Sequence, residues 1–365
     1  MNPTMSDTLS AIMRNADTAK IHFIIGIGRS GTTLLMQSLN GSEQCLATPE
    51  NHFVMTFYDK YAHQKNIDPT QLAADIHQYY QNKKQNRTSL HTWQYHLDDF
   101  FHYLQYHSPR PLHYGHVCRA FLLSMRYLGR SNEQVTHIVD KEHDYSQYIP
   151  QLIQLFPNAK FIVSIRDYRA VINSHQQSPN ERISLPAAVA LLWRNNYRYL
   201  RQQNKLYPDQ FLFIRYEDII IHQHETIELI CQFIGIPFQQ QLLEIHINMQ
   251  HWLTQHQNHP EMTPRKAKKW SDLAQPINPN RGESWQKSLT PYTIVLADCI
   301  CAQEAAHFGY APIYQPNWLQ RIYIYLKNLP QLIYAFFAYL IFAKYYYHLP
   351  LWCRIKLVKY LKVKK

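Results

Sequence analysis

Several features that would assign a chain of this length directly to a functional class are missing from the sequence. The six cysteines include no CxxC pair, and the first thirty residues lack the basic start, apolar stretch and small-residue cleavage site of a signal peptide. The 21 histidines include no HExxH motif and no paired-ligand spacing. We therefore expect a cytoplasmic protein with free thiols and without a metal site.

Acidic residues are scarce relative to basic ones. The 365 residues include 26 Asp and Glu against 37 Lys and Arg, which gives a net charge of +11 and a pI near 9.2. Such a chain favours anionic partners: a phosphorylated nucleotide, a nucleic acid or an acidic membrane surface. With 46% hydrophobic and 17% charged residues the composition is that of a globular protein, long enough for one large α/β domain or two smaller ones.

Short apolar runs rich in β-branched residues alternate with helical patterns along the chain. This alternation predicts a three-layer α/β fold, in which helices cover both faces of a parallel sheet, and ligands of such sheets bind at the carboxyl ends of the strands. The expected strands are 21–27, 136–140, 160–165 and 211–216. The clearest expected helices are 184–208 and 290–310, the second with Thr290 as its cap, Pro291 in its first turn and Gly309 at its end.

The same patterns predict how the chain is organised. Residues 1–19 form an N-terminal extension and 20–315 the main domain. A helical insertion is expected at about 56–134, where strand signals are few. A polar stretch with four prolines, about 255–284, reads as a long loop of the kind that often acts as a lid. Residues 316–365 form an apolar and basic tail.

The stretch "IGIGRSGTTLL" follows the first expected strand and has the glycines of a phosphate-binding loop. A Walker-type NTPase needs a lysine after the second glycine, and Thr32 stands there instead. The only cation of the loop is Arg29. The backbone amides from Ser30 through Gly31 and Thr32 to Thr33, at the start of a helix, can still bind one phosphate. The loop therefore predicts a single 5′ phosphate with a substituent rather than a triphosphate.

A second anion site is expected at the end of the strand 160–165. Arg166 ends this strand and Ser174 follows eight residues later on the next helix, so a guanidinium and a hydroxyl can bind a second phosphate together. Other strand ends and the basic segment 280–289, at the end of the expected lid, supply further candidates. These are Lys141, Tyr216, Arg281 and Lys287.

In this order the motifs resemble the sulfotransferase family that uses 3′-phosphoadenosine 5′-phosphosulfate (PAPS). "GRSGTTLL" is similar to its 5′-phosphosulfate loop, and the R(x7)S spacing from Arg166 to Ser174 to its 3′-phosphate motif. The stretch "DKEHDYSQYIPQLIQLFPNAKFIVSIRDYRAVINS" looks like the tyrosylprotein branch and its bacterial relatives. "RYEDI", "CQFIGIPF" and "SWQKSLTPYTI" continue the likeness, which covers roughly residues 20–312.

The resemblance implies transfer of a sulfuryl group from PAPS to an acceptor hydroxyl (carbohydrate, lipid or other), without a metal. It makes Arg29 and Lys141 the groups that stabilise charge on the leaving phosphate. It also points to Glu50, 21 residues after the loop arginine, as the general base. We expect Glu50 to be buried beside Phe53 and Val54. The residues that the resemblance assigns to PAPS binding are Arg29, Ser30, Gly31, Thr32, Thr33, Arg166, Ser174, Tyr216, Arg281 and Lys287.

Several alternatives remain open. His52 is a second candidate for the base, because other branches of the family use histidine. "TPEN" around Glu50 departs from the acidic pattern of the tyrosylprotein branch, so tyrosine is not carried over as the acceptor. A P-loop nucleotide kinase or NTPase would require magnesium and ATP. A non-enzymatic, membrane-associated nucleotide or RNA binder would explain the charge, but nothing resembles an RNA-binding module, so no nucleic-acid partner is expected.

The tail changes character after Tyr310. Residues 328–343 carry no charge, and as a helix they would span about 24 Å, short of the ~30 Å hydrocarbon core of a bilayer. The end of the chain is basic, and aromatic residues beside lysines suit a membrane interface. We expect residues 328–365 to lie on a membrane, which would place the protein peripherally at the inner face; the alternative is an apolar helix that docks on the catalytic domain.

Overall fold

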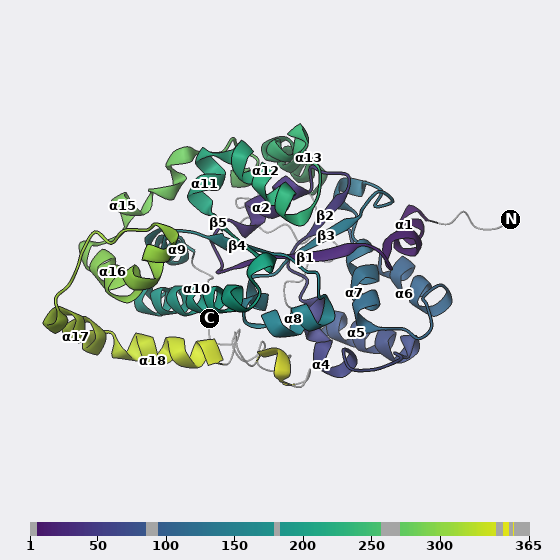
Figure 1. Ribbon diagram of the computed structural model, residues 1–365, viewed down its shortest axis with the longest axis horizontal. Coiled ribbons are helices and arrows are strands. Elements are labelled where there is room, and N and C mark those ends of the chain that lie inside the picture. The colour runs from purple at the N-terminus through teal and green to yellow at the C-terminus, as the bar shows by residue number, and fades with distance from the viewer. Residues whose placement is uncertain are drawn as a thin grey trace.

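The computed structural model of the protein describes residues 6–84, 94–178, 183–256, 271–340, 346–349 and 353. Its centre is a five-stranded sheet in the order β2-β3-β1-β4-β5, with every neighbouring pair parallel (Figure 1). The strands are β1 (Lys20–Gly26), β2 (Cys45–Thr48), β3 (His137–Lys141), β4 (Phe161–Ile165) and β5 (Phe211–Arg215). The predicted parallel α/β fold is therefore confirmed.

The register brings the carboxyl ends of the strands together at one edge of the sheet. Ile24 of β1 pairs with Lys141 at the end of β3, and Gly26 pairs with Ser164 of β4. Ile165, the last residue of β4, pairs with Arg215, the last of β5. The segments that follow the strands therefore all start at this edge, which is where ligands of parallel sheets bind.

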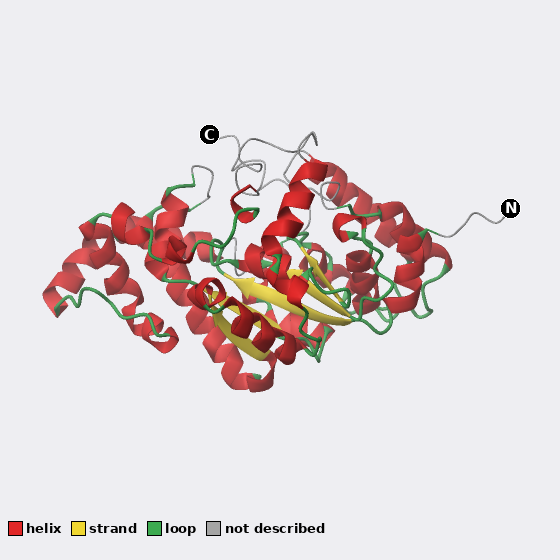
Figure 2. Cartoon of the chain, turned by 90° about the horizontal axis from the view of Figure 1, so that it is seen from above, coloured by secondary structure: helices red, strands yellow, loops and turns green. Residues whose placement is uncertain are grey.

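Helices cover both faces of the sheet, which explains why the strands are nearly continuous apolar runs. Figure 1 shows α2, α11, α12 and α13 on one side and α8 and α10 on the other, and Figure 2 shows the twist of the sheet between them. These helices are α2 (Thr32–Leu39), α8 (Ile149–Leu155), α10 (Pro186–Leu206), α11 (Tyr216–Ile221), α12 (Gln223–Ile234) and α13 (Ile245–His256).

The two clearest helix predictions are confirmed. Residues 184–208 contain α10, and residues 290–310 contain α16 (Pro291–Ala305). The Thr290 side chain caps α16 by accepting a hydrogen bond from the Thr293 amide at 3.2 Å. Gly309 follows with a φ of 78°. Strand β2 was not predicted, because its four residues are too few to show a period.

The expected insertion and the N-terminal extension both contain helices. Helix α3 (Phe53–Thr56) leads into the insertion, which holds α4 (Tyr58–Tyr61), α5 (Pro69–Lys84), α6 (Leu97–Tyr106) and α7 (Tyr114–Leu123). The extension holds α1 (Asp7–Asn15), which buries Leu9 and Ile12 and packs against α6 and α7. The extension is therefore joined to the insertion rather than separate from it.

The lid loop expected at 255–284 is wrong at both of its ends. Helix α13 continues to His256 because it buries Met249 and Trp252, and Pro279–Gly282 forms a short 3-10 helix, η5. Residues 257–270 of the expected lid lie outside the described residues. After η5 come α15 (Trp285–Ser288), which packs on α9 (Tyr168–Gln176), and then α16.

The described part of the tail forms two helices, α17 (Trp318–Lys327) and α18 (Leu329–Ala338). Helix α18 packs along α10, burying Ala335 and Ala338, and Gln331 accepts a hydrogen bond from the Ala187 amide at 3.2 Å. The inner side of α18 is therefore docked on the main domain, as the alternative to a membrane-bound tail predicted. In the described part of the chain, no helix combines the length and apolarity needed to cross a bilayer. Residues 341–345, 350–352 and 354–365 of the expected membrane segment lie outside the described residues.

Candidate active site

The predicted phosphate-binding loop leaves β1 at Gly26 and enters α2 at Gly31. Gly31 has a φ of 95°, and a Cβ placed on it would lie 2.4 Å from Cδ2 of Tyr216, so this position requires glycine. The first intrahelical bonds of α2 are donated by Leu34 and Leu35 to the Gly31 carbonyl. The amides that precede them, from Gly31 to Thr33, are in the position of an anion-binding helix N-terminus.

Arg29 joins this loop to the second predicted anion site. Its backbone has a φ of 73°, unusual for a residue other than glycine and typical of functional turns. Its Nε donates to Ser174 Oγ at 2.9 Å, and the Arg166 guanidinium donates to the Arg29 carbonyl at 3.1 Å. The loop and the R(x7)S pair therefore meet directly, as the assignment of two phosphates on one nucleotide requires.

Arg166 is held from several sides. Its guanidinium stacks over the Tyr216 ring at 4.3 Å and donates to the Arg281 carbonyl at 3.1 Å. Only 8% of Arg166 is exposed, and its Nε is buried with no hydrogen-bond partner among the described residues. A buried cationic donor without an acceptor among the described residues, next to the amides of a helix N-terminus, fits a phosphorylated nucleotide.

The other residues predicted to bind the cofactor differ in how closely they contact Arg166. Tyr216 is 6% exposed and supports both Gly31 and Arg166. Arg281 contributes its carbonyl, while its guanidinium lies 3.4 Å from Asp272. Lys287 is exposed on α15. Direct cofactor contacts of the Arg281 and Lys287 side chains stay predictions.

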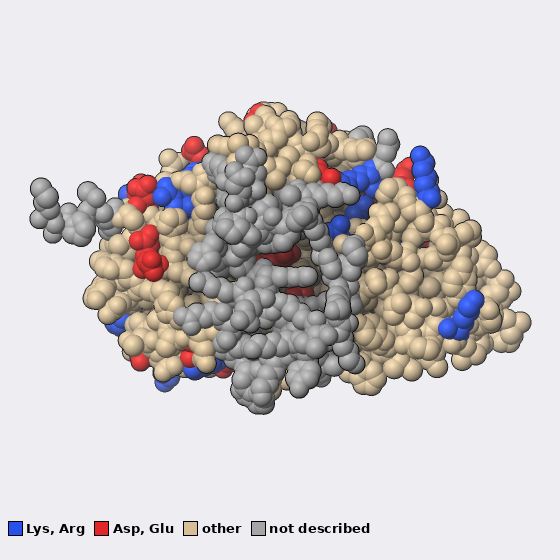
Figure 3. Space-filling view, turned by 180° about the vertical axis from the view of Figure 1, so that it is seen from behind, with Lys and Arg blue, Asp and Glu red and all other residues tan. Residues whose placement is uncertain are grey.

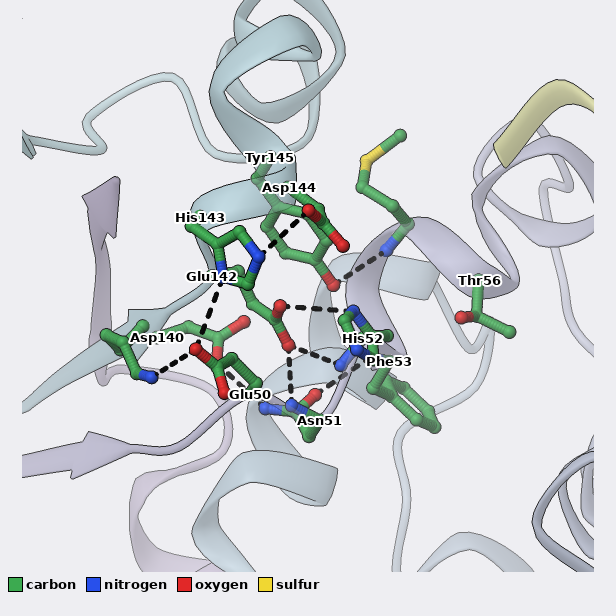
Figure 4. A network of polar contacts seen from close by, with 12 residues as sticks. Glu50, Asn51, His52, Phe53, Thr56, Asp140, Glu142, His143, Asp144 and Tyr145 are labelled. Carbon is green, nitrogen blue, oxygen red and sulfur yellow. Dashed lines mark hydrogen bonds and ion pairs between the residues drawn. The ribbon is translucent and has the colours of Figure 1, made fainter. Parts of the chain in front are cut away.

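The proposed acid–base residues lie on the other side of β1. Lys141 ends β3 with its side chain only 3% exposed, and its ammonium donates to Glu50 Oε1. His143 Nδ1 lies 3.2 Å from the same oxygen (Figure 4). Glu50 was expected to be buried against Phe53 and Val54, and this is wrong. Its side chain is 36% exposed and lies between the nitrogens of Lys141 and His143. Phe53 and Val54 are buried in the core.

His143 also contacts a second carboxylate. Its Nε2 lies 3.1 Å from Asp144 Oδ1. Burial alone would lower the pKa of His143, but the carboxylates of Asp144 and Glu50 outweigh it and raise the pKa well above its usual value. The raised pKa favours the imidazolium form, in which both ring nitrogens can donate to the two carboxylates.

His52, the second candidate for the base, is held by a buried carboxylate. Glu142 is fully buried and accepts hydrogen bonds from the backbone amides of Asn51 and His52, and its other oxygen lies 3.1 Å from His52 Nδ1. His52 itself has a φ of 62°. Glu142 therefore fixes the turn that carries both Glu50 and His52 (Figure 4).

A further carboxyl lies beneath this turn. Asp140 is fully buried and accepts hydrogen bonds from Thr48 Oγ1 at 2.7 Å and Asn51 Nδ2 at 2.8 Å. Burial, together with the nearby Glu142, raises the pKa of Asp140 well above its usual value. Sequence reasoning singled out Lys141 in this stretch and missed its neighbours. The available signal was "DKEHD", five titratable residues in a row at the end of an apolar strand.

Hydrogen bonds connect the two sides of the site. The Ser146 hydroxyl donates to the Gly26 carbonyl at 3.1 Å and accepts from the Gly26 amide at 3.2 Å. Ser146 belongs to the 3-10 helix η2 (His143–Gln147), which therefore attaches His143 to the start of the phosphate loop. No group of three or more His, Cys, Asp or Glu side chains within the described ranges could hold a metal ion.

Comparison with known proteins agrees with this geometry. The chain is 29% identical over 120 residues to a putative protein-tyrosine sulfotransferase of Caenorhabditis elegans, covering 32% of this chain and 46% of that protein. It is 25% identical over 136 residues to protein-tyrosine sulfotransferase 1 of Danio rerio, covering 34% and 36%. The matches thus span less than half the length of these curated relatives.

A solved structure shares the fold. The sulfotransferase domain of the Synechococcus PCC 7002 olefin synthase is 20% identical and superposes with a TM-score of 0.51, covering 82% of this chain and 97% of that domain. Residues 22–240, more than half of the chain, match the family described as the sulfotransferase family. With the phosphate loop, the R(x7)S pair and the Lys141–Glu50 pair at one edge of the sheet, this chain belongs to the sulfotransferase family.

Proposed function

We propose that the protein transfers a sulfuryl group from PAPS to the hydroxyl of an acceptor. The observation that carries the proposal is the contact between Arg29 Nε and Ser174 Oγ at 2.9 Å, with Arg166 bonded to the same turn. It brings the loop for one phosphate and the motif for another into a single site. A nucleotide with a phosphate on each side of its ribose requires such a double site.

The residues of the β4 side would hold the donor. The amides from Gly31 to Thr33 and the Arg29 guanidinium suit the 5′ phosphate. Arg166 and Ser174 suit the 3′ phosphate, and the buried Nε of Arg166 is a donor that no described residue occupies. When bound, PAPS supplies a sulfuryl group attached to a phosphate that can leave.

The residues of the β3 side would manage charge and the proton. As the acceptor oxygen forms its bond to sulfur and the bond from sulfur to the 5′ phosphate breaks, the acceptor proton passes to the Glu50 carboxylate. Lys141 and Arg29 neutralise the charge that develops on the leaving phosphate. An ammonium carries three donors, so Lys141 can hold Glu50 and a phosphate oxygen at the same time.

His52 is a second candidate for the base because it forms a contact with Glu142 that would orient its ring. The contact between Lys141 and Glu50 favours Glu50, since it places the base beside a cation that also serves the leaving group. The two assignments predict different losses for the variants Glu50→Gln and His52→Gln.

We propose only that the acceptor carries a hydroxyl group. The names of the relatives suggest protein tyrosine, whereas the "TPEN" segment around Glu50 departs from the pattern of that branch. We place the reaction in the cytoplasm, at the inner face of the membrane. The state of the cysteines is compatible with this placement, since all six are free and five are buried.

Thermal denaturation with ligands tests the donor assignment. Adenosine 3′,5′-bisphosphate, the product that PAPS leaves behind, should raise the melting temperature, and ATP with magnesium should not. Stabilisation by ATP and magnesium alone would contradict the proposal in favour of a kinase or NTPase. Incubation of lysate fractions with sulfur-labelled PAPS should then yield a labelled acceptor, and its chemistry would name the substrate class.

A further inference from the structure

Helices α17 and α18 present an unusually apolar surface. Scattered exposed apolar residues are normal, but a contiguous set marks an interaction site. Within about 20 consecutive positions, ten large apolar side chains are 45% to 68% exposed. They form what we call the α17–α18 face: Trp318, Leu319, Ile322, Tyr323, Leu326, Leu329, Ile333, Tyr334, Phe336 and Phe337.

This face is held in place by contacts on its opposite side. Helix α18 packs on α10 through Ala335 and Ala338, and α17 packs on α16 and α18. At the corner between the two helices, Asn328 is buried and donates to Tyr292 Oη and to the Ile324 carbonyl, both at 2.8 Å. The exposed side chains are therefore the outer side of a packed two-helix unit.

The charge of this end of the chain is of one sign. After Glu304 the sequence contains nine Lys and Arg and no Asp or Glu, which leaves a net charge of only +2 for the preceding residues. On α17, the Lys327 ammonium lies over the rings of Tyr292 and Tyr323, at 4.3 and 5.6 Å. Figure 3 shows a broad, mostly uncharged surface on the side of the molecule where α17 and α18 lie.

We propose that the α17–α18 face binds the surface of an anionic lipid bilayer without crossing it. Aromatic and aliphatic side chains next to lysines and arginines are the composition of interfacial helices, and anionic headgroups complement the charge. Each helix has ten residues and would span about 15 Å, half of the ~30 Å hydrocarbon core. A second copy of the chain fits less well, because pairing would bring the exposed Arg321 and Lys327 side chains of two α17 helices together.

The end of α18 also contacts a segment of the candidate active site. Tyr339, one residue after α18, donates to Gln147 Oε1 at 2.6 Å, and Gln147 ends the 3-10 helix that begins with His143. Bilayer binding is nevertheless independent of sulfuryl transfer, since none of the face residues belongs to the catalytic or nucleotide-binding set. The two proposals can therefore fail separately.

Vesicle sedimentation of the full chain tests the proposal. Wild type should sediment with phosphatidylcholine vesicles that contain phosphatidylglycerol, less with phosphatidylcholine alone, and less again at high salt. The double variant Phe336→Ser, Phe337→Ser should bind anionic vesicles about tenfold or more weakly, because two apolar anchors are lost. The matched control is Leu206→Ser with Ile221→Ser, two side chains that are 67% and 60% exposed elsewhere. It should bind like wild type.

The melting temperature and its shift with adenosine 3′,5′-bisphosphate should be the same in wild type and both double variants, which separates lipid binding from folding and from nucleotide binding. Equal vesicle binding by the face variant and the control would overturn the proposal. So would absence of binding to anionic vesicles by the full chain. A dimer in sedimentation equilibrium that only the face variant dissociates, without vesicle binding, would assign the face to a second copy instead.

Discussion

The two sides of the sheet edge differ in how they use charge. On the β4 and β5 side, the carboxylates are satisfied within the structure: Asp167 binds the Arg169 guanidinium at 2.8 Å, and Glu217 accepts from Tyr310 and from the Asp167 amide. In the part of the chain that the structure describes, the Nε of the buried Arg166 guanidinium has no acceptor. This side is suited to bind an anion.

On the β2 and β3 side, carboxylates outnumber the cations. Glu50 lies between Lys141 and His143, and Asp140 and Glu142 are buried beneath the turn that carries it. Groups of both signs in contact suit the transfer of a proton rather than the binding of a phosphate. The difference indicates that affinity for the nucleotide and catalysis can be changed separately.

We expect the variant Glu50→Gln to separate turnover from nucleotide affinity most strongly. The amide has almost the same shape but cannot take a proton, so turnover with labelled PAPS should fall about 10²- to 10⁴-fold. The dissociation constant for adenosine 3′,5′-bisphosphate, measured by calorimetry, should stay near the wild-type value. Wild-type turnover in Glu50→Gln, together with a comparable loss in His52→Gln, would transfer the role of base to His52.

A smaller effect, of the opposite kind, is expected for Arg166→Lys. Lysine keeps the charge but loses the planar group that stacks on Tyr216 and bonds two carbonyls. Affinity for the bisphosphate should fall roughly tenfold or more, while turnover at saturating donor changes less. Arg198→Lys, on the exposed surface of α10, is the control and should bind normally. Unchanged affinity in Arg166→Lys would remove this residue from the anion site.

The smallest effect concerns stability and its dependence on pH. Because the carboxylates raise the pKa of His143 in the folded state, its stabilising contribution is complete below the unfolded value of about 6.5 and is lost as pH rises through the folded value. The free energy of unfolding should therefore differ most between wild type and His143→Gln at acidic pH, with the difference shrinking toward alkaline pH. His63→Gln, an exposed histidine, is the control. A difference that grows with pH would contradict the assigned charge state.

Much of the geometry of the candidate anion site could be predicted because its signals are local. The strands are short apolar runs rich in β-branched residues, the predicted phosphate loop is one short segment, and Arg166 and Ser174 are only eight residues apart. The fold then needs only the parallel register to bring these segments to one edge.

The carboxylate network could not be predicted in the same way, because its partners are distant in sequence. Glu142 bonds the amides of Asn51 and His52 about 90 positions earlier, and Asp140 bonds Thr48 of a strand too short to recognise. The tail shows a similar limit. Its composition predicted an apolar helix. The side of that helix that packs on the main domain is set by the surface of α10, which is distant in sequence.

The most direct measurement of the central claim is the preference for a 3′ phosphate. Calorimetry with adenosine 3′,5′-bisphosphate and with adenosine 5′-monophosphate would compare wild type and Ser174→Ala. We expect wild type to bind the bisphosphate at least about tenfold more tightly, and this ratio to shrink in Ser174→Ala. Equal affinity of wild type for the two nucleotides, or a ratio unchanged in Ser174→Ala, would contradict the account.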